Sequence, residues 1–170
     1  MRIAISGPSG CGNTTVSTLL SKKLGCKMIN FTFRSMAEER GIDFWEMCAL
    51  AEKDDNVDIE CDRRQVQMAM AEDACVLGSR LAIWMLKDAD LKVYLKASVE
   101  ERARRIVKRE GGDLADRREQ TMQRDAHDTA RYKRIYGIDN TKGPEIADLV
   151  IDTEGKTPEQ IVDLIIDAIK

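Results

Sequence analysis

A short glycine-rich segment near the start of the chain contains the residues with the clearest chemical meaning. It reads Gly7-Pro8-Ser9-Gly10-Cys11-Gly12-Asn13-Thr14, and Thr15 follows directly. The glycines allow successive backbone N–H groups to turn inward and surround an anion, and the hydroxyl of Thr14 can ligate a Mg²⁺ that bridges two phosphates. The spacing is that of the phosphate-binding loop GxxxxGK[ST]. We therefore expect residues 7–15 to bind ATP and Thr14 to hold the metal.

One position departs from this motif, because Asn13 stands where the motif has lysine. That lysine normally follows the charge on the β- and γ-phosphates while a phosphoryl group is transferred. An amide can donate a hydrogen bond but carries no charge. The loop therefore predicts nucleotide binding and leaves transfer dependent on other cations. The alternative is a glycine-rich turn with no ligand.

Several arginines could supply the missing charge and bind the second substrate. Arg34 and Arg80 are candidates for binding the phosphate of an acceptor nucleotide, because a guanidinium stays charged and can bind two phosphate oxygens at once. Arg80 also follows an expected strand, where open α/β sheets place ligands. The alternative for both is an exposed or structural arginine.

Two further groups of arginines recur at helical spacing. Arg102, Arg105 and Arg109 share one helix face, as do Arg117, Arg124 and Arg131, with Asp128 between the last two. We predict that Arg109, Arg124 and Arg131 stabilise a transferring phosphoryl group and that Arg105 contacts ATP. A solvated charged face with Asp and Glu partners is the common alternative.

Other polar residues give weaker indications. Asp62 and Gln65 could read the base of the acceptor nucleotide, or they could be helix-surface or packing residues. His127, the one histidine, has charged neighbours and is expected to be exposed. We find no pattern typical of a zinc site, a catalytic triad or a covalent nucleophile.

Five short apolar runs must position these residues, and helical patterns separate them. The runs span residues 2–6, 27–30, 74–77, 91–95 and 149–152, and the helical patterns follow residue 12 and cover about 33–40, 44–53, 57–71, 102–109 and 116–136. This alternation predicts an α/β fold with a five-stranded parallel sheet between helices. We expect residues 1–170 to form one domain, with a helical insert at about 31–73 and a short lid at about 105–120. Ser98 with Glu101, and Thr157 with Gln160, mark two helix starts.

The composition excludes several classes of protein. The net charge is −3, with 43% hydrophobic and 34% charged residues, so a folded domain without affinity for nucleic acid or anionic lipid is expected. The five cysteines have no CxxC spacing, which is typical of reduced thiols. No secretory signal pattern and no membrane-length apolar stretch appear, so we expect a cytoplasmic protein, with a monomer as the simplest state.

Seven further segments carry a family resemblance, which runs along essentially the whole chain. They are, in order, FRSMAEERG, DRRQ, SRLAIWM, ADLKVYLKA, RARRIVKREG, RYKRIYGID and ADLVIDT, and they resemble the short cytidylate kinases. The resemblance implies a three-layer P-loop NTPase fold with a nucleoside monophosphate-binding insert and a lid. It also implies phosphoryl transfer from ATP to CMP or dCMP with Mg²⁺. Arg34 and Arg80 match its acceptor phosphate positions, and Arg105 and Arg109 match arginines near ATP.

The sequence departs from that family pattern at three places. They are Asn13, Gly78 where a glutamate is more usual, and the short stretch Asn30-Phe31-Thr32. These departures leave two alternatives to a cytidylate kinase. One is a weak or inactive nucleotide-binding homologue that acts as a sensor or interaction module. The other is a kinase for a different small metabolite, because the fold alone does not select the acceptor.

Overall fold

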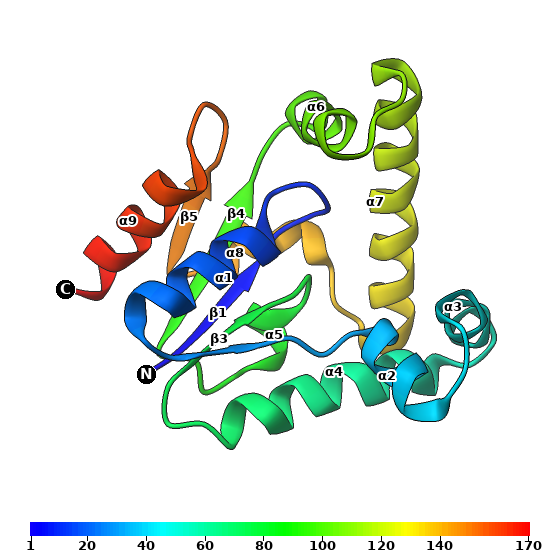
Figure 1. Cartoon of the computed structure of the whole chain (residues 1–170), viewed down its shortest axis with the longest axis horizontal. Helices are drawn as coiled ribbons and strands as arrows, with labels where there is room; N and C mark the ends of the chain where they lie inside the picture. The colour runs from blue at the N-terminus through cyan, green and yellow to red at the C-terminus, as the bar shows by residue number, and fades with distance from the viewer.

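A five-stranded parallel sheet forms the centre of the computed structural model, which describes residues 1–170 (Figure 1). Its strands are β1 (Arg2–Ser6), β2 (Lys27–Ile29), β3 (Cys75–Gly78), β4 (Leu91–Lys96) and β5 (Leu149–Asp152). They lie in the order β2-β3-β1-β4-β5, and every neighbouring pair is parallel. The predicted sheet is confirmed, with each strand boundary within one residue.

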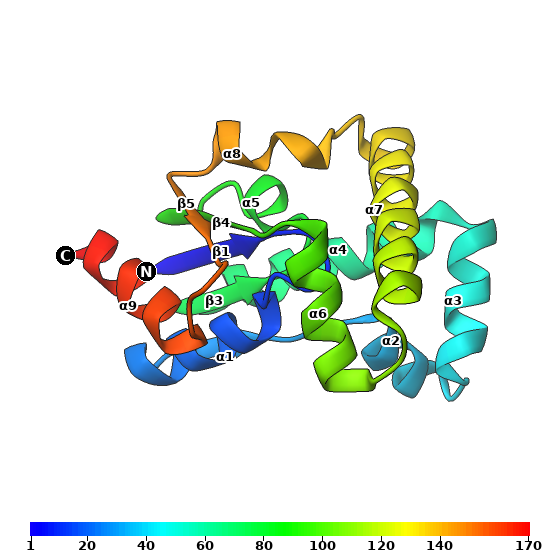
Figure 2. The same ribbon diagram turned by 90° about the horizontal axis from the view of Figure 1, so that it is seen from above.

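Helices cover both faces of the sheet (Figure 2). They are α1 (Asn13–Leu24), α2 (Phe33–Arg40), α3 (Phe44–Lys53), α4 (Asp55–Met70), α5 (Ala82–Met85), α6 (Val99–Glu110), α7 (Leu114–Tyr136), α8 (Gly143–Ile146) and α9 (Pro158–Ile169), with a 3-10 turn at Asn140–Lys142. None combines the length and the apolar character that crossing a membrane requires. The five cysteines form no disulfide.

The strand residues alternate between two hydrophobic clusters, as the two-residue period of a strand requires. Ile3 and Ile5 of β1 face α1 and α9, where they pack with Val16, Leu20 and Ile165 among others. Ala4 points to the opposite face, toward Ile83 of α5. Because both faces are covered, residues 3–6 of β1 are all buried, as expected for the central strand of a parallel sheet. The rigid centre of the molecule therefore lies directly beneath the phosphate-binding loop.

The helical insert has a small core of its own. Helices α2, α3 and α4 pack around Met36, Met47, Val57 and Cys61, together with Phe31 from the preceding loop. In Figure 1, α7 extends from α6 at one end to α4 at the other. Contacts near its two ends agree with this view, because Arg118 pairs with Glu100 of α6 and Arg134 pairs with Asp55 of α4. Helix α7 therefore connects the lid to the insert.

The connection between α6 and α7, inside the predicted lid, is shorter than the sequence pattern suggests. We expected an irregular segment over residues 110–116, but only residues 111–113 separate α6 from α7. The difference arises because the Asp113 carboxylate accepts a hydrogen bond from the Asp116 N–H at 3.1 Å and caps α7, which begins two residues earlier than expected. Gly111 and Gly112 have φ values of +78° and +97°, which make the tight connection possible.

Both predicted helix caps are present, but they differ in detail. At α9, Thr157 and Gln160 exchange backbone and side-chain hydrogen bonds and form a complete capping box. At α6, the Ser98 hydroxyl accepts from the Glu101 N–H, whereas the Ser98 N–H donates to Glu154 at 2.9 Å. Glu101 instead pairs with arginines of its own helix. A carboxylate from the segment after β5 thus replaces the expected partner at α6.

Candidate nucleotide-binding site

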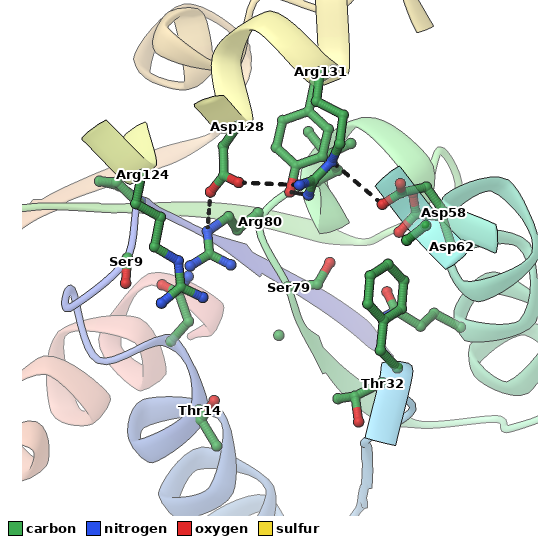
Figure 3. Close-up of a pocket in the computed structure, with 18 of the residues that line it drawn as sticks. Ser9, Thr14, Thr32, Asp58, Asp62, Ser79, Arg80, Arg124, Asp128 and Arg131 are labelled. Carbon is green, nitrogen blue, oxygen red and sulfur yellow. Dashed lines mark hydrogen bonds and ion pairs between the residues drawn. The ribbon is translucent and has the colours of Figure 1, made fainter. Parts of the chain in front are cut away.

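A pocket of about 1270 Å³ lies at the carboxyl end of the sheet, between the phosphate-binding loop, the insert and α7 (Figure 3). Open α/β sheets bind their ligands at this edge. A pocket for one small molecule usually measures roughly 300–1,000 Å³. The volume is therefore large enough for two substrates side by side.

The loop has the backbone shape that anion binding requires. Gly10 and Gly12 have φ values of +82° and +91°, in the region that favours glycine. A Cβ on Gly7 would lie 2.5 Å from the Leu95 carbonyl oxygen, so the loop passes close to β4 without room for a side chain. Helix α1 begins at Asn13, directly after the loop, so its N-terminal N–H groups and dipole point at the same space.

The predicted loop residues divide between the pocket wall and the layer behind it. Those that line the pocket are Pro8, Ser9, Gly10, Gly12, Asn13, Thr14 and Thr15. Gly7 and Cys11 lie behind them and are buried. Burial raises the pKa of the Cys11 thiol to about 11, so this cysteine is a neutral core residue. The two hidden residues can serve a ligand through their backbone only.

The Asn13 side chain turns back onto its own loop. Its Nδ2 donates a hydrogen bond to the Gly7 carbonyl oxygen at 2.7 Å. Its Oδ1 is buried and has no hydrogen-bond partner. The amide therefore stabilises the closure of the loop, whereas the usual lysine would extend toward the phosphates.

Three arginines and two aspartates form a cluster opposite the loop (Figure 3). Arg80 Nε lies 2.9 Å from Asp128 Oδ2, while Arg131 lies 3.6 Å from the other oxygen of Asp128 and 3.5 Å from Asp58. Asp128 is 7% exposed and bridges the two arginines. This network holds Arg80 and Arg131 in place at the pocket wall.

Arg124 differs from its neighbours because it forms no ion pair, although it lines the same pocket. Desolvation lowers the pKa of its guanidinium, and the positive charge of Arg80 lowers it further. Figure 3 shows the side chains of Arg80 and Arg124 extending toward the side of the pocket where Ser9 and Thr14 lie. Two cations that face each other without an anion between them favour the binding of a phosphate group there.

The other predicted arginines have different environments. The Arg34 guanidinium lies 4.4 Å from the centre of the Phe44 ring, and Arg34 does not line the pocket. Arg105 donates to the carbonyl oxygens of Gly10 at 3.2 Å and Thr153 at 2.9 Å, so it supports the loop from outside the pocket. Arg109 lines the pocket but is mostly exposed and pairs with Glu110. Their roles toward a nucleotide stay predictions.

Arg102 supports the phosphate-binding loop. Its helical spacing did not distinguish it from Arg105 and Arg109, which share its face. Arg102 is 7% exposed, binds both oxygens of Asp125 at 3.0 and 2.8 Å, and donates to the Ser9 carbonyl oxygen at 3.2 Å. Together with Arg105, it attaches α6 to the phosphate-binding loop. The shared face of Arg102, Arg105 and Arg109 therefore contacts protein over much of its length.

The wall formed by α4 presents further polar residues. The Tyr136 hydroxyl donates to Asp62 at 2.5 Å, and Gln65 donates to the Phe31 carbonyl oxygen at 2.7 Å. Both Asp62 and Gln65 line the pocket, as does Asp58, which lies one turn earlier on α4 and was not among the predicted residues. Its spacing of four residues from Asp62 was the available signal. His127 also lines the pocket and is exposed, as predicted.

Replacing Asp62 with asparagine should stabilise the fold at neutral pH. Burial raises the pKa of Asp62 from 3.8 to about 6, so the native state binds this proton more tightly than the unfolded state. Stability is therefore lost as the pH rises from about 4 to 6, at about 1.4 kcal/mol per pH unit, which amounts to roughly 3 kcal/mol above pH 6. An asparagine avoids this loss and keeps an acceptor for Tyr136.

Urea unfolding at pH 4 and pH 8 measures this difference. The gain of Asp62→Asn over the wild type should appear at pH 8 and vanish at pH 4. Asp88→Asn, at an exposed position, serves as the control and should show no such change. Equal gains of Asp62→Asn at both pH values would contradict the expectation.

Comparisons with known proteins give one consistent result for the sequence. A model of the cytidylate kinase-like family matches residues 2–155. Cytidylate kinase 2 of Borrelia garinii subsp. bavariensis is 44% identical over 172 aligned positions, which cover 99% of this chain and 96% of the relative. Cytidylate kinase of Archaeoglobus fulgidus is 38% identical, with coverage of 100% and 95%.

Solved structures agree on the fold. Shikimate kinase from Acinetobacter baumannii in complex with shikimate is similar with a TM-score of 0.67 and 18% identity, over 99% of this chain and 92% of that one. Deoxyadenosine kinase from M. mycoides with bound dATP gives a TM-score of 0.58 and 18% identity, over 99% of both chains. At these identities the likeness supports the fold alone, and the predicted P-loop kinase fold is confirmed.

Proposed function

The chain belongs to the cytidylate kinase-like family, and we propose that it transfers a phosphoryl group from ATP to a nucleoside monophosphate, with CMP or dCMP as the preferred acceptor. The observation that carries this proposal is the single pocket in which the phosphate-binding loop faces Arg80, Arg124 and Arg131. A loop that cups one phosphate chain, opposite arginines that can bind another phosphate, suits transfer between two nucleotides.

Each side of the pocket has a separate task in this reaction. The backbone N–H groups of residues 9–15, which include the N-terminus of α1, bind the phosphates of ATP. Arg80 and Arg124 orient the acceptor phosphate, one oxygen of which forms a bond to the γ-phosphorus while the bond from that phosphorus to the β–γ bridging oxygen breaks. ADP leaves with the electron pair. The acceptor phosphate is already ionised at neutral pH, so no general base is needed.

Magnesium fits this site in a restricted way. Thr14 is exposed and lines the pocket (Figure 3), whereas no group of three acidic, histidine or cysteine side chains could hold a metal ion by itself. Because Mg²⁺ keeps several waters and binds phosphate oxygens readily, Thr14 and the nucleotide would hold it together. When bound, it neutralises charge on the phosphates.

The pocket also supports a second candidate function. The Asn13 amide is bound to Gly7, and the glycine at position 78 provides no carboxylate. A homologue that binds nucleotides without transferring a phosphoryl group would keep the loop and lose these two charges. Arg124, which is free of carboxylate partners, favours the kinase, because a binding module has little use for an unpaired cation beside the loop.

Turnover against a panel of acceptors separates the two functions. We expect ADP release with ATP and Mg²⁺ to be fastest with CMP or dCMP and at least tenfold slower with UMP, AMP and GMP. Calorimetric titration with each nucleotide should be run in parallel. Binding without turnover would support the non-catalytic homologue, and turnover with a different metabolite, such as a small hydroxy acid, would overturn the choice of acceptor.

A further inference from the structure

Asp58 on α4 has a buried carboxylate, one oxygen of which has no hydrogen-bond partner. It is 5% exposed and lines the pocket. Its Oδ1 lies 3.5 Å from Arg131 Nε, whereas its Oδ2 is buried and has no hydrogen-bond partner. A buried acceptor without a donor costs roughly 1–3 kcal/mol, so such groups in native proteins usually have a partner. A ligand in the pocket can provide that partner.

Several polar groups around Asp58 already have hydrogen-bond or ion-pair partners. Asp62 accepts from the Tyr136 hydroxyl, and the amide nitrogen of Gln65 donates to the Phe31 carbonyl oxygen. Asp128 pairs with two arginines. Among these carboxylates, Asp58 is the one with a buried oxygen that has no hydrogen-bond partner, so it gains the most from a donor on a ligand.

Asp58 lies at the end of the pocket where an acceptor base would be. In Figure 3, Asp58 and Asp62 are on the opposite side of the pocket from Ser9 and Thr14. A monophosphate whose phosphate is oriented by Arg80 and Arg124 toward the loop would extend its base toward α4. Phe44 of α3 also lines the pocket and offers an aromatic surface for a base.

The chemistry of a carboxylate discriminates between bases. It accepts hydrogen bonds and donates none, so it pairs with the exocyclic amino group of cytosine and repels the carbonyl oxygen that uracil has at the same position. We infer that Asp58 is the residue that selects the acceptor, by accepting a hydrogen bond from an exocyclic amino group on its base. This inference rests on the proposed function and extends it to the choice of cytosine over uracil.

The substitution Asp58→Asn tests this role through a ratio of acceptors. An amide has the same shape but can present an N–H group to the uracil oxygen. We expect the ratio of kcat/KM for CMP to that for UMP to fall at least tenfold. The substitution also removes one of the two ion pairs of Arg131, which keeps its pair with Asp128, but that loss affects both acceptors and cancels in the ratio.

Asp55→Asn is the matched control. Asp55 lies on the same helix, pairs with Arg134 and does not line the pocket. It should leave the CMP to UMP ratio unchanged. Calorimetric titration of both variants with CMP and UMP gives the same comparison without turnover.

Three results would overturn the inference, and they differ from a failure of the proposed function. Equal losses with CMP and UMP would mean that Asp58 acts only by holding Arg131. A change in the CMP to dCMP ratio, with the base ratio constant, would assign the free oxygen to a sugar hydroxyl. Unchanged relative affinities for CMP and UMP in calorimetry would exclude Asp58 from base selection. If the wild type binds CMP through Asp58 but phosphorylates no monophosphate, only the kinase proposal fails.

Discussion

Replacing Arg124 with alanine is expected to lower kcat for phosphoryl transfer by about 10³-fold, while the affinity for ATP changes less than about tenfold. Arg124 lines the pocket without an ion-pair partner, and the loop opposite it has no lysine to follow the charge on the transferred group. Its cation is therefore available for the transition state. Steady-state kinetics with ATP and CMP, combined with calorimetric titration of ATP, measures the two effects separately.

Two further variants make this prediction sharper. Arg118→Ala removes an arginine from the same helix, where it pairs with Glu100 outside the pocket, and should leave kcat within about twofold of the wild type. Asn13→Lys adds a cation to the loop, so Arg124→Ala should cost less in that background. Equal losses of kcat and of ATP affinity in Arg124→Ala would show that the residue acts in binding rather than in transfer.

Much of the fold was predictable because local chemistry determines it. Strand β1 and the loop after it follow from an apolar run and three glycines, two of which adopt positive φ values in the structure. The start of α9 follows from Thr157 and Gln160, whose side chains complete a capping box within four residues. These signals need no information from distant parts of the chain.

The parts of the site that were not predicted depend on contacts between distant segments. Helical spacing placed Arg102 and Arg105 on one face, but it could not show that this face meets the carbonyl oxygens of Ser9 and Gly10. Asp62 and Tyr136 are 74 residues apart, so their hydrogen bond follows only from the way α7 meets α4. Periodicity defines which residues share a face, whereas the packing of the elements decides what that face contacts.

The same distinction applies to Asn13. Its identity in the sequence predicted a loss of charge at the phosphates. The structure adds that the Asn13 amide donates a hydrogen bond to the Gly7 carbonyl oxygen. The presence of asparagine in place of lysine does not by itself imply this contact. We therefore expect the missing cation to come from outside the loop, and Arg124 is the pocket arginine that no carboxylate pairs with.

Replacing Gly78 with alanine is expected to destabilise the fold by about 2–3 kcal/mol. A Cβ at this position would lie 2.2 Å from Ser17 Oγ, 3.0 Å from Ser17 Cβ and 3.3 Å from the Asn13 carbonyl oxygen. Ser17 is fully buried on α1, so its hydroxyl must rotate away and the helix must shift slightly to admit the extra atom. Urea unfolding of the wild type and the variant measures the loss.

The substitution Ser17→Gly should recover most of that loss, because it removes the two closest atoms and leaves the Asn13 carbonyl oxygen at a tolerable distance. By itself it should cost about 1 kcal/mol, since glycine is a poor helix former. The double variant should therefore be more stable than the sum of the two single losses predicts. Additive losses would mean that Gly78 matters for a reason other than its contact with Ser17. A double variant that is more stable than the sum predicts would explain why a larger residue, including an acid, does not fit at position 78. Ser17 of α1 occupies the space beside β3 that the side chain of such a residue would need.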